Sequence, residues 1–409
     1  MKILFLHPKA WIGEYAILKK LGELGHEVCV LEERRDGSIS KPLQTKDFLE
    51  PGDGIATFWY DPKRGWEKLL TWPFDRIFKK SFEGRNLAHR MWIIRRVLRH
   101  FQPDIAICTD GFTYAIPAAL LRRMGLFPIP LLASYIGGDI LDCASASYGK
   151  RRTPLVTWLI RQGINQADGL RAVSPLVARH LLAEGAAAKK IGICPSHLVF
   201  DQSLLDDIFT RRSEIASRVR TRYAIPPGSP LIVTLSLNNK GKGLQVLAQA
   251  WPKILQALPA ARWLLCGPPD PWLEQSVWPL LRQAGVGDSV CATGSLRGAE
   301  VFEHLATADV HINPSLCEGL NMVTVEAAAV GTPTLTSDGA GIAEWIERYT
   351  AGLVVPAGDV ERLADATIAA LRNPAQCEIW SRNARAMSVE FGLDNVAQRL
   401  LALLPTPPN

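Results

Sequence analysis

Two glutamates, Glu318 and Glu326, stand eight residues apart where an expected loop passes into an expected helix. If all the residues between them were helical, they would be separated by roughly 12 Å along the axis. That length is comparable to a nucleoside diphosphate that links a ribose to a sugar. Each carboxylate can accept hydrogen bonds from a pair of hydroxyl groups, and the unpaired N–H groups of residues 321–324 favour a diphosphate at the helix start. The alternative is that Glu318 caps a loop and Glu326 is a solvated helix residue.

The residues around this pair form a longer pattern. It consists of Ala308-Asp309-Val310, Pro314-Ser315, Glu318-Gly319, Glu326-Ala327, Ala329, Gly331 and Pro333. This pattern resembles the E-x7-E signature of the GT4 family of retaining glycosyltransferases, which have the two-domain GT-B fold. The resemblance implies that Glu318 holds sugar hydroxyls and that Glu326 holds the ribose. Asn321 stands where the family often has glycine, and asparagine is a common substitute where the backbone needs an unusual φ.

The segment LSLNNKGKG, residues 235–243, resembles the loop that binds the donor diphosphate in this family. Lys242 matches the family's lysine, but Ser236 or Leu237 stands where the family has an arginine. Lys240 offers a point charge there without the planar fork of an arginine. The alternative for Lys242 is an ordinary exposed lysine of a turn. The resemblance implies these donor-binding residues: Gly319, Asn321, Met322, Val323, Glu326, Ser236, Lys240 and Gly267.

The N-terminal half carries a looser match. The stretch YIGGD, residues 135–139, resembles the family's HG-x-D pattern with an isoleucine in place of the histidine. Paired glycines let the backbone approach a ligand closely, and Asp139 either orients a hydroxyl group or caps the segment that follows. After the first strand, one glycine remains of a pair that the family places near the acceptor. The resemblance implies a catalytic group of Glu318, Lys242 and Asp139, and an acceptor side formed by Trp11, Gly13, Gly137 and Gly138.

Short apolar strands alternate with helical patterns along the chain, which predicts βαβ units on parallel sheets. We therefore predict an α/β protein with the GT-B fold, in which two Rossmann-like domains face each other across a ligand cleft. An acceptor-binding domain is expected at residues 1–198 and a donor-binding domain at residues 199–385, with the junction at the polar stretch 201–207. A C-terminal helix and tail, residues 386–409, is expected to return to the N-terminal domain.

Composition favours a globular protein, with 47% hydrophobic and 21% charged residues and a formal net charge of +6. The eight cysteines stand singly, without the spacing of a zinc site or a disulfide framework, which suggests a reducing compartment. The first residues, MKILFLH, predict a strand rather than a signal peptide. No apolar run approaches the roughly 20 residues that span a bilayer. We expect a cytoplasmic protein with no metal site and no cofactor, the nucleotide sugar being a co-substrate.

A basic aromatic segment interrupts the strand–helix alternation. Residues 63–100 carry eleven Lys and Arg but three acids, interleaved with Trp and Phe. Resemblance to a family with lipid-linked acceptors suggests peripheral docking on an anionic membrane, since basic and aromatic residues favour that interface. An acceptor wall is an equal alternative, and residues 90–99 can instead form an ordinary amphipathic helix with Met91, Trp92, Ile94 and Leu98 facing the core. Nucleic-acid binding is not expected.

The function implied by the resemblance is retaining transfer of a hexose-type sugar from a UDP- or GDP-sugar. The acceptor is a hydroxyl of a glycan, a lipid-linked saccharide or a small molecule. Without a metal-binding DxD pair in the sequence, Lys242 and the helix-start amides are expected to offset the leaving charge. The alternatives are a catalytically impaired nucleotide-binding protein of the same fold and a nucleotide-sugar epimerase.

Overall fold

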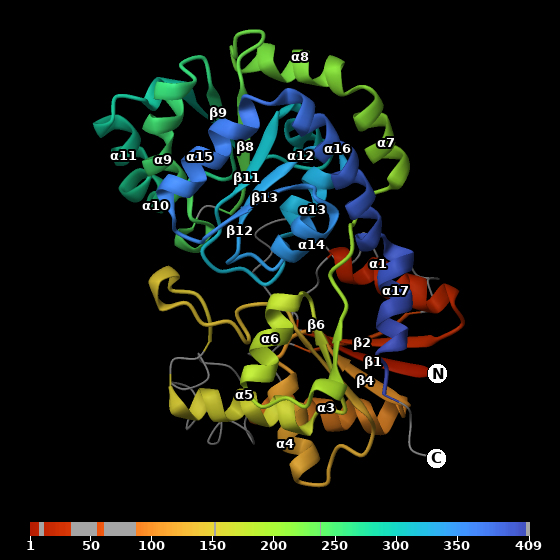
Figure 1. Cartoon of the computed structure of the whole chain (residues 1–409). Helices are drawn as coiled ribbons and strands as arrows, with labels where there is room; N and C mark the ends of the chain where they lie inside the picture. The colour runs from red at the N-terminus through yellow and green to blue at the C-terminus, as the bar shows by residue number, and fades with distance from the viewer. Residues whose placement is uncertain (8–11, 34–54, 61–86, 151–152, 238, 406–409) are drawn as a thin grey trace. The chain divides into compact units, whose positions relative to one another are not determined.

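The computed structural model describes residues 1–7, 12–33, 55–60, 87–150, 153–237 and 239–405. The chain forms two compact units (Figure 1). Unit 1 contains Met1–Asp142, Gly149–Val199 and Leu393–Asn409, and unit 2 contains Cys143–Tyr148 and Phe200–Gly392. The chain therefore enters the body of unit 2 at residue 200 and leaves it at residue 393.

Unit 1 is built on a seven-stranded sheet in the order β3-β2-β1-β4-β5-β6-β7, whose neighbouring strands pair in parallel. Buried apolar runs such as that of β1 are typical of parallel strands covered on both faces. The strands are β1 (Lys2–His7), β2 (Glu27–Glu33), β3 (Ala56–Tyr60), β4 (Ile105–Cys108), β5 (Leu131–Tyr135), β6 (Gly169–Ala172) and β7 (Ile191–Ile193).

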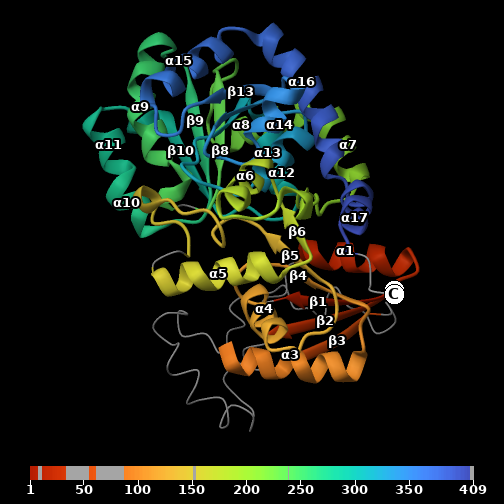
Figure 2. The same ribbon diagram turned by 60° about the horizontal axis from the view of Figure 1, so that its bottom comes forward.

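Helices cover both faces of this sheet, with α1 and α17 on one face and α3 on the other (Figure 2). The helices are α1 (Ile12–Glu23), α3 (Leu87–Phe101), α4 (Ala115–Arg123), α5 (Pro154–Gln166), α6 (Pro175–Ala183), the 3₁₀ turn η3 (Ala188–Lys190) and α17 (Leu393–Ala402).

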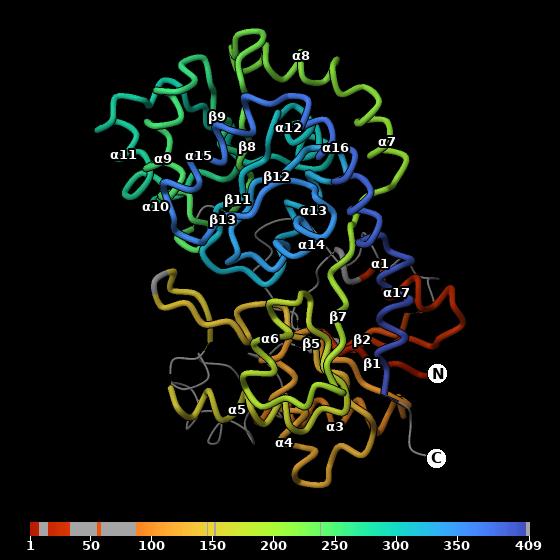
Figure 3. The backbone as a smooth tube through the Cα atoms, in the orientation of Figure 1, coloured from red at the N-terminus to blue at the C-terminus, as the bar shows by residue number. Residues whose placement is uncertain are grey.

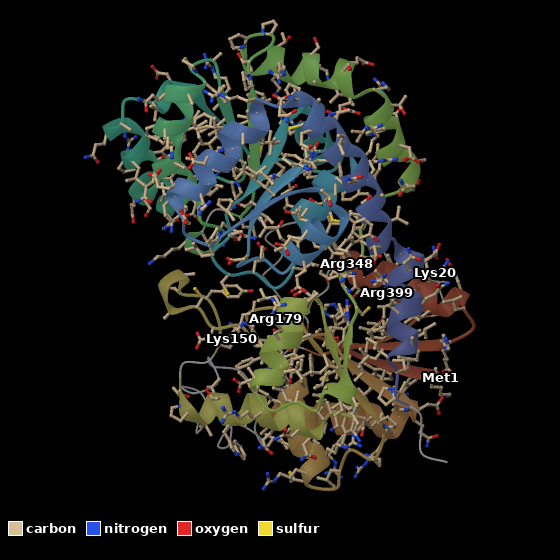
Figure 4. The ribbon with its side chains drawn as sticks, viewed as in Figure 1. Met1, Lys20, Lys150, Arg179, Arg348 and Arg399 are labelled. Atoms are coloured by element: carbon tan, nitrogen blue, oxygen red, sulfur yellow. The ribbon has the colours of Figure 1, made fainter. Side chains whose placement is uncertain are left out.

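The last helix, α17, belongs to the core of unit 1. Its residues Val396, Ala397 and Leu400 are buried in the same apolar cluster as strand β1. At its start, Asp394 forms an ion pair of 2.5 Å with Lys20 of α1, one of the residues marked in Figure 4. The C-terminal helix therefore packs in the same unit as the N-terminal strand β1.

Unit 2 is built on a six-stranded sheet in the order β10-β9-β8-β11-β12-β13, again with parallel neighbours. Its core includes the packed rings of Trp251 and Trp263, whose indole N–H groups donate to Ser289 Oγ (2.7 Å) and Thr234 Oγ1 (2.8 Å). The strands are β8 (Leu231–Leu235), β9 (Arg262–Cys266), β10 (Val290–Gly294), β11 (Val310–Asn313), β12 (Thr334–Ser337) and β13 (Gly352–Val355).

The helices of unit 2 also lie on both faces, with α9 and α15 on one side and α12 and α13 on the other (Figure 1). Its helices are η2 (Ala144–Ala146), α7 (Gln202–Thr210), α8 (Arg212–Arg222), η4 (Lys240–Lys242), α9 (Leu244–Ala257), α10 (Pro271–Ser276), α11 (Trp278–Gln283), η5 (Gly287–Ser289), α12 (Ala299–Thr307), α13 (Met322–Ala329), α14 (Ala343–Tyr349), α15 (Val360–Leu371), α16 (Pro374–Ser388) and η6 (Val389–Phe391).

The polar stretch 201–207, where we placed the domain junction, is largely helical. Asp201 is the N-cap of α7, with Oδ1 accepting a hydrogen bond of 2.9 Å from the amide of Ser203. Leu205 and Ile208, three residues apart, bury one face of the helix. A capped helix with a narrow apolar face therefore follows the start of unit 2 at residue 200.

Candidate functional site

The loops that carry the predicted donor residues leave two adjacent strands of unit 2. The strand order reverses between β8 and β11, which pair with each other and run in the same direction. In an open parallel sheet, such a switch point places the loops after the two strands at one edge, where ligands bind. Residues 236–243 follow β8 and residues 314–321 follow β11, as the tube in Figure 3 traces.

These two loops are held in close contact by their backbones. Gly243 has φ +67°, and a Cβ at this position would lie 1.9 Å from the carbonyl oxygen of Pro314. The amide of Leu316 also donates to the carbonyl of Gly241 at 2.8 Å. Only glycine fits this approach, which brings Lys242 beside the loop that contains Glu318.

Glu318 is fixed at both its backbone and its side chain. Its carboxylate Oε1 forms an ion pair with Lys242 Nζ. Its Oε2 accepts hydrogen bonds from Ser315 Oγ (2.9 Å) and Asn321 Nδ2 (2.6 Å). The backbone pairs on the other side with the loop that contains Gly339, whose carbonyl accepts from the Glu318 amide at 2.9 Å. Lys242 is thus neither an exposed turn lysine nor a free cation in this structure.

Asn321 is the N-cap of α13 and has φ +86°, which confirms the prediction of an unusual φ at this position. Its Oδ1 accepts a hydrogen bond of 2.9 Å from the amide of Thr324. We expected the amides of residues 321–324 to be unpaired, and this expectation is wrong for Thr324, whose amide donates to Asn321. In the part of the chain that the structure describes, the amides of Met322 and Val323 have no such cap, as the first turn of a helix allows.

Glu326 lies one turn further along α13 and is half-buried, so it is not the solvated residue of the alternative interpretation. Among the described residues, none forms a hydrogen bond or an ion pair with its carboxylate. Burial raises the pKa of Glu326 to about 7. A half-buried carboxylate without a protein partner is a candidate acceptor for ligand hydroxyl groups.

The remaining predicted donor residues lie at the same edge of the sheet. The amide of Ser236 donates to Cys266 at 3.1 Å, and Gly267, with φ +150°, donates to Gly294 at 3.1 Å. Lys240 is exposed in η4, and Gly319 is buried in the loop before α13.

A cavity of about 600 Å³ opens beside Gly267, at the ends of β9 and β10. Trp278, Leu273 and Pro271 contribute apolar walls, and Asp270 lies at the start of α10. Our sequence interpretation did not include these lining residues. The only available signal was the Asp-Pro pair that starts α10, which predicts a helix cap and not a cavity.

In unit 1, the structure places Asp139 in a tight loop. Its carboxylate accepts hydrogen bonds from the amides of Gly111 (2.8 Å), Gly137 (2.8 Å) and Ile136 (3.1 Å to each oxygen). Burial raises the pKa of Asp139 to about 6, against the effect of these amides, which lower it. Both oxygens are engaged by amides of residues that precede Asp139, so the carboxylate holds the glycine loop and does not cap the segment that follows.

The other predicted acceptor residues also belong to unit 1. Gly137 is buried with φ +150°, Gly138 is half-buried, and Gly13 lies in the first turn of α1. Trp11 lies outside the described residues. The expected cleft between the domains, and a joint site of these residues with Glu318, stay predictions.

The basic aromatic segment is described only from residue 87 onward, because residues 61–86 lie outside the described part. Helix α3 buries Ile93, Ile94, Val97 and Phe101, and also Arg90. The predicted core face was therefore right for Ile94 and wrong for Met91, Trp92 and Leu98, which are half-buried. Among the described residues, no helix is long and apolar enough to cross a membrane, and no group of three or more His, Cys, Asp or Glu side chains could hold a metal ion.

Two Rossmann-like units with parallel sheets, and a pair of touching loops at the switch point of the second, are typical of the GT-B class. The sequence matches "Glycosyl transferase 4-like domain" over residues 15–196 and "Glycosyl transferases group 1" over residues 229–373. The chain belongs to the GT4-type glycosyltransferases.

Similar proteins agree with this membership. The "Putative colanic acid biosynthesis glycosyltransferase WcaL" of Salmonella typhimurium is 26% identical, with 94% of this chain and 93% of that protein covered. A GDP-mannose-dependent alpha-(1-6)-phosphatidylinositol monomannoside mannosyltransferase of Mycobacterium tuberculosis is 33% identical, with 37% of this chain and 40% of that protein covered.

Solved structures show the same fold. Sucrose-phosphate synthase of Thermosynechococcus elongatus superimposes with a TM-score of 0.76 at 19% identity, covering 98% of both chains. Anabaena Alr3699/HepE in complex with UDP and glucose gives a TM-score of 0.72 at 17% identity, again covering 98% of both chains.

Proposed function

We propose that this glycosyltransferase moves a hexose-type sugar from a UDP- or GDP-sugar to an acceptor hydroxyl, with retention of the anomeric configuration. The acceptor is a hydroxyl of a glycan, a lipid-linked saccharide or a small molecule. One observation carries the proposal. Glu318 and Glu326 stand on either side of the uncapped amides that start α13, at the switch point of the unit 2 sheet.

In this proposal the donor lies along the first turns of α13. Glu326 accepts hydrogen bonds from the ribose hydroxyls, and Glu318 accepts them from the sugar hydroxyls. The amides of Met322 and Val323, together with Lys242, neutralise the diphosphate. The residues fit this division because Glu326 has no partner among the described residues, whereas Lys242 is already beside Glu318.

The reaction needs charge stabilisation more than a protein nucleophile. The bond between the anomeric carbon and the diphosphate oxygen breaks, and the acceptor oxygen forms its bond on the same face. The acceptor proton passes to the departing phosphate oxygen, so that atoms and charges balance. Lys242 and the helix-start amides stabilise the leaving group. We propose that no metal ion and no further cofactor take part.

The identity of the nucleotide is open between two donors. UDP is bound in the Anabaena structure, and GDP-mannose is the donor in the name of the mycobacterial relative. A thermal-shift screen of UDP-, GDP- and ADP-sugars would separate them, because a ligand that binds the folded state raises its Tm by mass action.

Two variants test the division of roles. Glu326→Ala should weaken binding of the nucleotide and of the nucleotide sugar alike. Glu318→Ala should leave binding of the free nucleotide within about twofold while it lowers sugar-dependent binding and turnover. Glu347→Ala, at an exposed position on α14, is the matched control for loss of one carboxylate. If the parent and both variants bind every nucleotide sugar equally well, the proposal is wrong.

A nucleotide-binding protein that has lost catalysis is the second candidate. The observation that favours it is the residue pair Ser236 and Leu237 in place of the expected arginine, with Leu237 exposed by 71%. Transfer to any acceptor in a panel would exclude this candidate. Turnover of the donor without an acceptor would instead indicate an epimerase.

A further inference from the structure

The side chain of Asn321 connects the candidate sugar-binding carboxylate to the start of a helix. Its Oδ1 accepts from the Thr324 amide at 2.9 Å, and its Nδ2 donates to Glu318 Oε2 at 2.6 Å. The backbone amide can only donate, so the orientation of the Asn321 amide group is fixed and its NH₂ faces the carboxylate. Asn321 is buried, with 5% of its surface exposed, which limits competition from water.

The second donor to Glu318 Oε2 is the hydroxyl group of Ser315, which is shared between two acceptors. Ser315 Oγ lies 2.9 Å from Glu318 Oε2 and 2.7 Å from Asn313 Oδ1, yet a hydroxyl group has one hydrogen to donate. Among the described residues, Asn321 Nδ2 donates to Glu318 Oε2 alone. The Asn321 side-chain amide is therefore the donor that fixes the position of Glu318 Oε2.

The backbone of Asn321 makes this arrangement unusual. At φ +86° and ψ +86°, glycine would adopt the conformation with less strain than any residue that has a Cβ. Glycine would, however, remove both side-chain hydrogen bonds. It would leave Oε2 with the shared hydroxyl of Ser315 alone and leave the Thr324 amide uncapped.

We propose that Asn321 is a positioning residue for sugar transfer, acting through Glu318; this inference rests on the proposed function. Asn321 holds Oε2, while Oε1 is paired with Lys242 in the structure. A bound diphosphate carries more negative charge than one carboxylate and draws Lys242 toward itself. Oε1 then becomes the acceptor for a sugar hydroxyl, at a position fixed by the hydrogen bond on Oε2.

Asn321→Gly is the direct test because glycine tolerates the backbone conformation. We expect kcat to fall about 10- to 100-fold, the range associated with a misplaced substrate-positioning group. We expect the Kd for the free nucleoside diphosphate to stay within about twofold. Asn373→Gly is the matched control: it also removes an asparagine N-cap (Oδ1 to Gln376 amide, 3.1 Å), at the exposed start of α16. It should leave kcat unchanged.

A double-mutant cycle distinguishes positioning from a general structural role. If Asn321 acts through Glu318, then Asn321→Gly should lower kcat in the parent and have no further effect in the Glu318→Ala background. Equal fold-losses in both backgrounds would overturn the inference, as would a parent-like kcat for Asn321→Gly. If Glu318→Ala itself left sugar-dependent turnover intact, the result would contradict the proposed function, on which this inference rests.

Asn321→Asp provides a second variant that does not depend on glycine. It keeps an oxygen for the Thr324 amide but puts an anion where the donor to Glu318 stood, so like charges meet. We expect a loss of kcat at least as large as that of Asn321→Gly, with the helix cap retained. A parent-like kcat in a folded Asn321→Asp protein would also contradict the inference.

Discussion

At the residue scale, the two carboxylate oxygens of Glu318 have different partners. Glu318 faces a cation at Oε1 and neutral donors at Oε2, and both it and Lys242 are about one-fifth exposed. Glu326 is also half-buried, but no described residue forms a hydrogen bond or an ion pair with its carboxylate. The two glutamates therefore differ in their contacts: neighbouring side chains hold Glu318, and no described residue holds the carboxylate of Glu326.

The raised pKa of Glu326 gives a stability prediction with a defined sign. Its pKa moves from 4.5 to about 7 on folding, so between these values the folded state holds more protons than the unfolded state. The free energy of unfolding then falls as pH rises through this window. Glu326→Gln removes the effect. We expect the Tm of this variant, relative to the parent, to increase from pH 4.5 to pH 8. A constant difference in Tm over this range would contradict the prediction.

The same group predicts the pH dependence of donor binding. Hydroxyl groups donate to the ionised carboxylate, which is lost below a pH of about 7. We expect the Kd for the preferred nucleotide to rise as the pH is lowered from 8 to 6, measured by isothermal titration calorimetry. In Glu326→Gln this rise should be absent and binding should be weaker at pH 8.

We expect the ammonium group of Lys242 to bind the diphosphate of the donor and not its ribose. Lys242→Met keeps much of the apolar stem and removes the ammonium group. We expect a Kd for the nucleoside diphosphate raised about 10-fold or more, as for a charge-assisted contact of about 1.5–3 kcal/mol. The Kd for the nucleoside alone should change little. The exposed Lys240 offers the control: Lys240→Met should have the smaller effect.

At the element scale, the site depends on two loops that touch through a glycine. Gly243 ends the turn η4 and packs against Pro314, so the loop after β8 and the loop after β11 approach at backbone distance. Helix α13 then starts directly after its N-cap Asn321, whose left-handed conformation turns the chain into the helix. A side chain at position 243 would clash with the Pro314 carbonyl and would push the two loops apart.

A pair of glycine variants separates strain from steric clash. Gly243 and Gly228 have similar φ values, +67° and +74°, but a Cβ at Gly228 meets nothing within 4 Å. Gly228→Ala should cost about 1–2 kcal/mol from backbone strain alone. Gly243→Ala should cost at least about 3 kcal/mol, because overpacking against Pro314 adds to the strain. Urea denaturation measures both. Equal losses would show that the close approach does not matter.

At the scale of the whole molecule, the chain is organised as two sheets with one strand order in common. In each sheet the first strand lies next to the fourth, and the C-terminal helix α17 completes the unit where the chain begins. The residues predicted to bind the donor lie in unit 2, and the glycine loop held by Asp139 lies in unit 1. This division is consistent with separate donor and acceptor modules.

Metal independence is tested on the whole enzyme. We expect turnover to be unchanged in EDTA, because in our proposal Lys242 and the α13 amides supply the charge that a metal ion would otherwise supply. Loss of turnover in EDTA, with recovery on adding Mg²⁺ or Mn²⁺, would contradict the proposed mechanism.

Association with a membrane surface is a further prediction for the full chain. We propose that the basic aromatic residues 63–100 favour anionic lipid. Flotation with vesicles that contain anionic phospholipid should recover more protein than flotation with neutral vesicles, and high salt should reduce the difference. Equal recovery from both vesicle types would favour the alternative of an acceptor wall.

The sequence by itself determined the class of fold, and it placed the predicted donor-binding glutamates in one short segment. Apolar strands that alternate with helices predict parallel sheets. Glu318 and Glu326 are only eight residues apart, so their placement on one loop and the following helix depends on local structure. The unusual φ of Asn321 was also predictable, because few residue types tolerate it.

Only the tertiary structure decided what those residues contact. The pairing of Lys242 with Glu318 joins positions 76 residues apart through the register of two strands. The closure of the Asp139 loop on Gly111 likewise depends on how β4 and β5 lie side by side. Such contacts are set by the order of strands in a sheet, and spacing along the chain does not encode that order. Burial, which raises the pKa of Glu326, is a property of the packed molecule for the same reason.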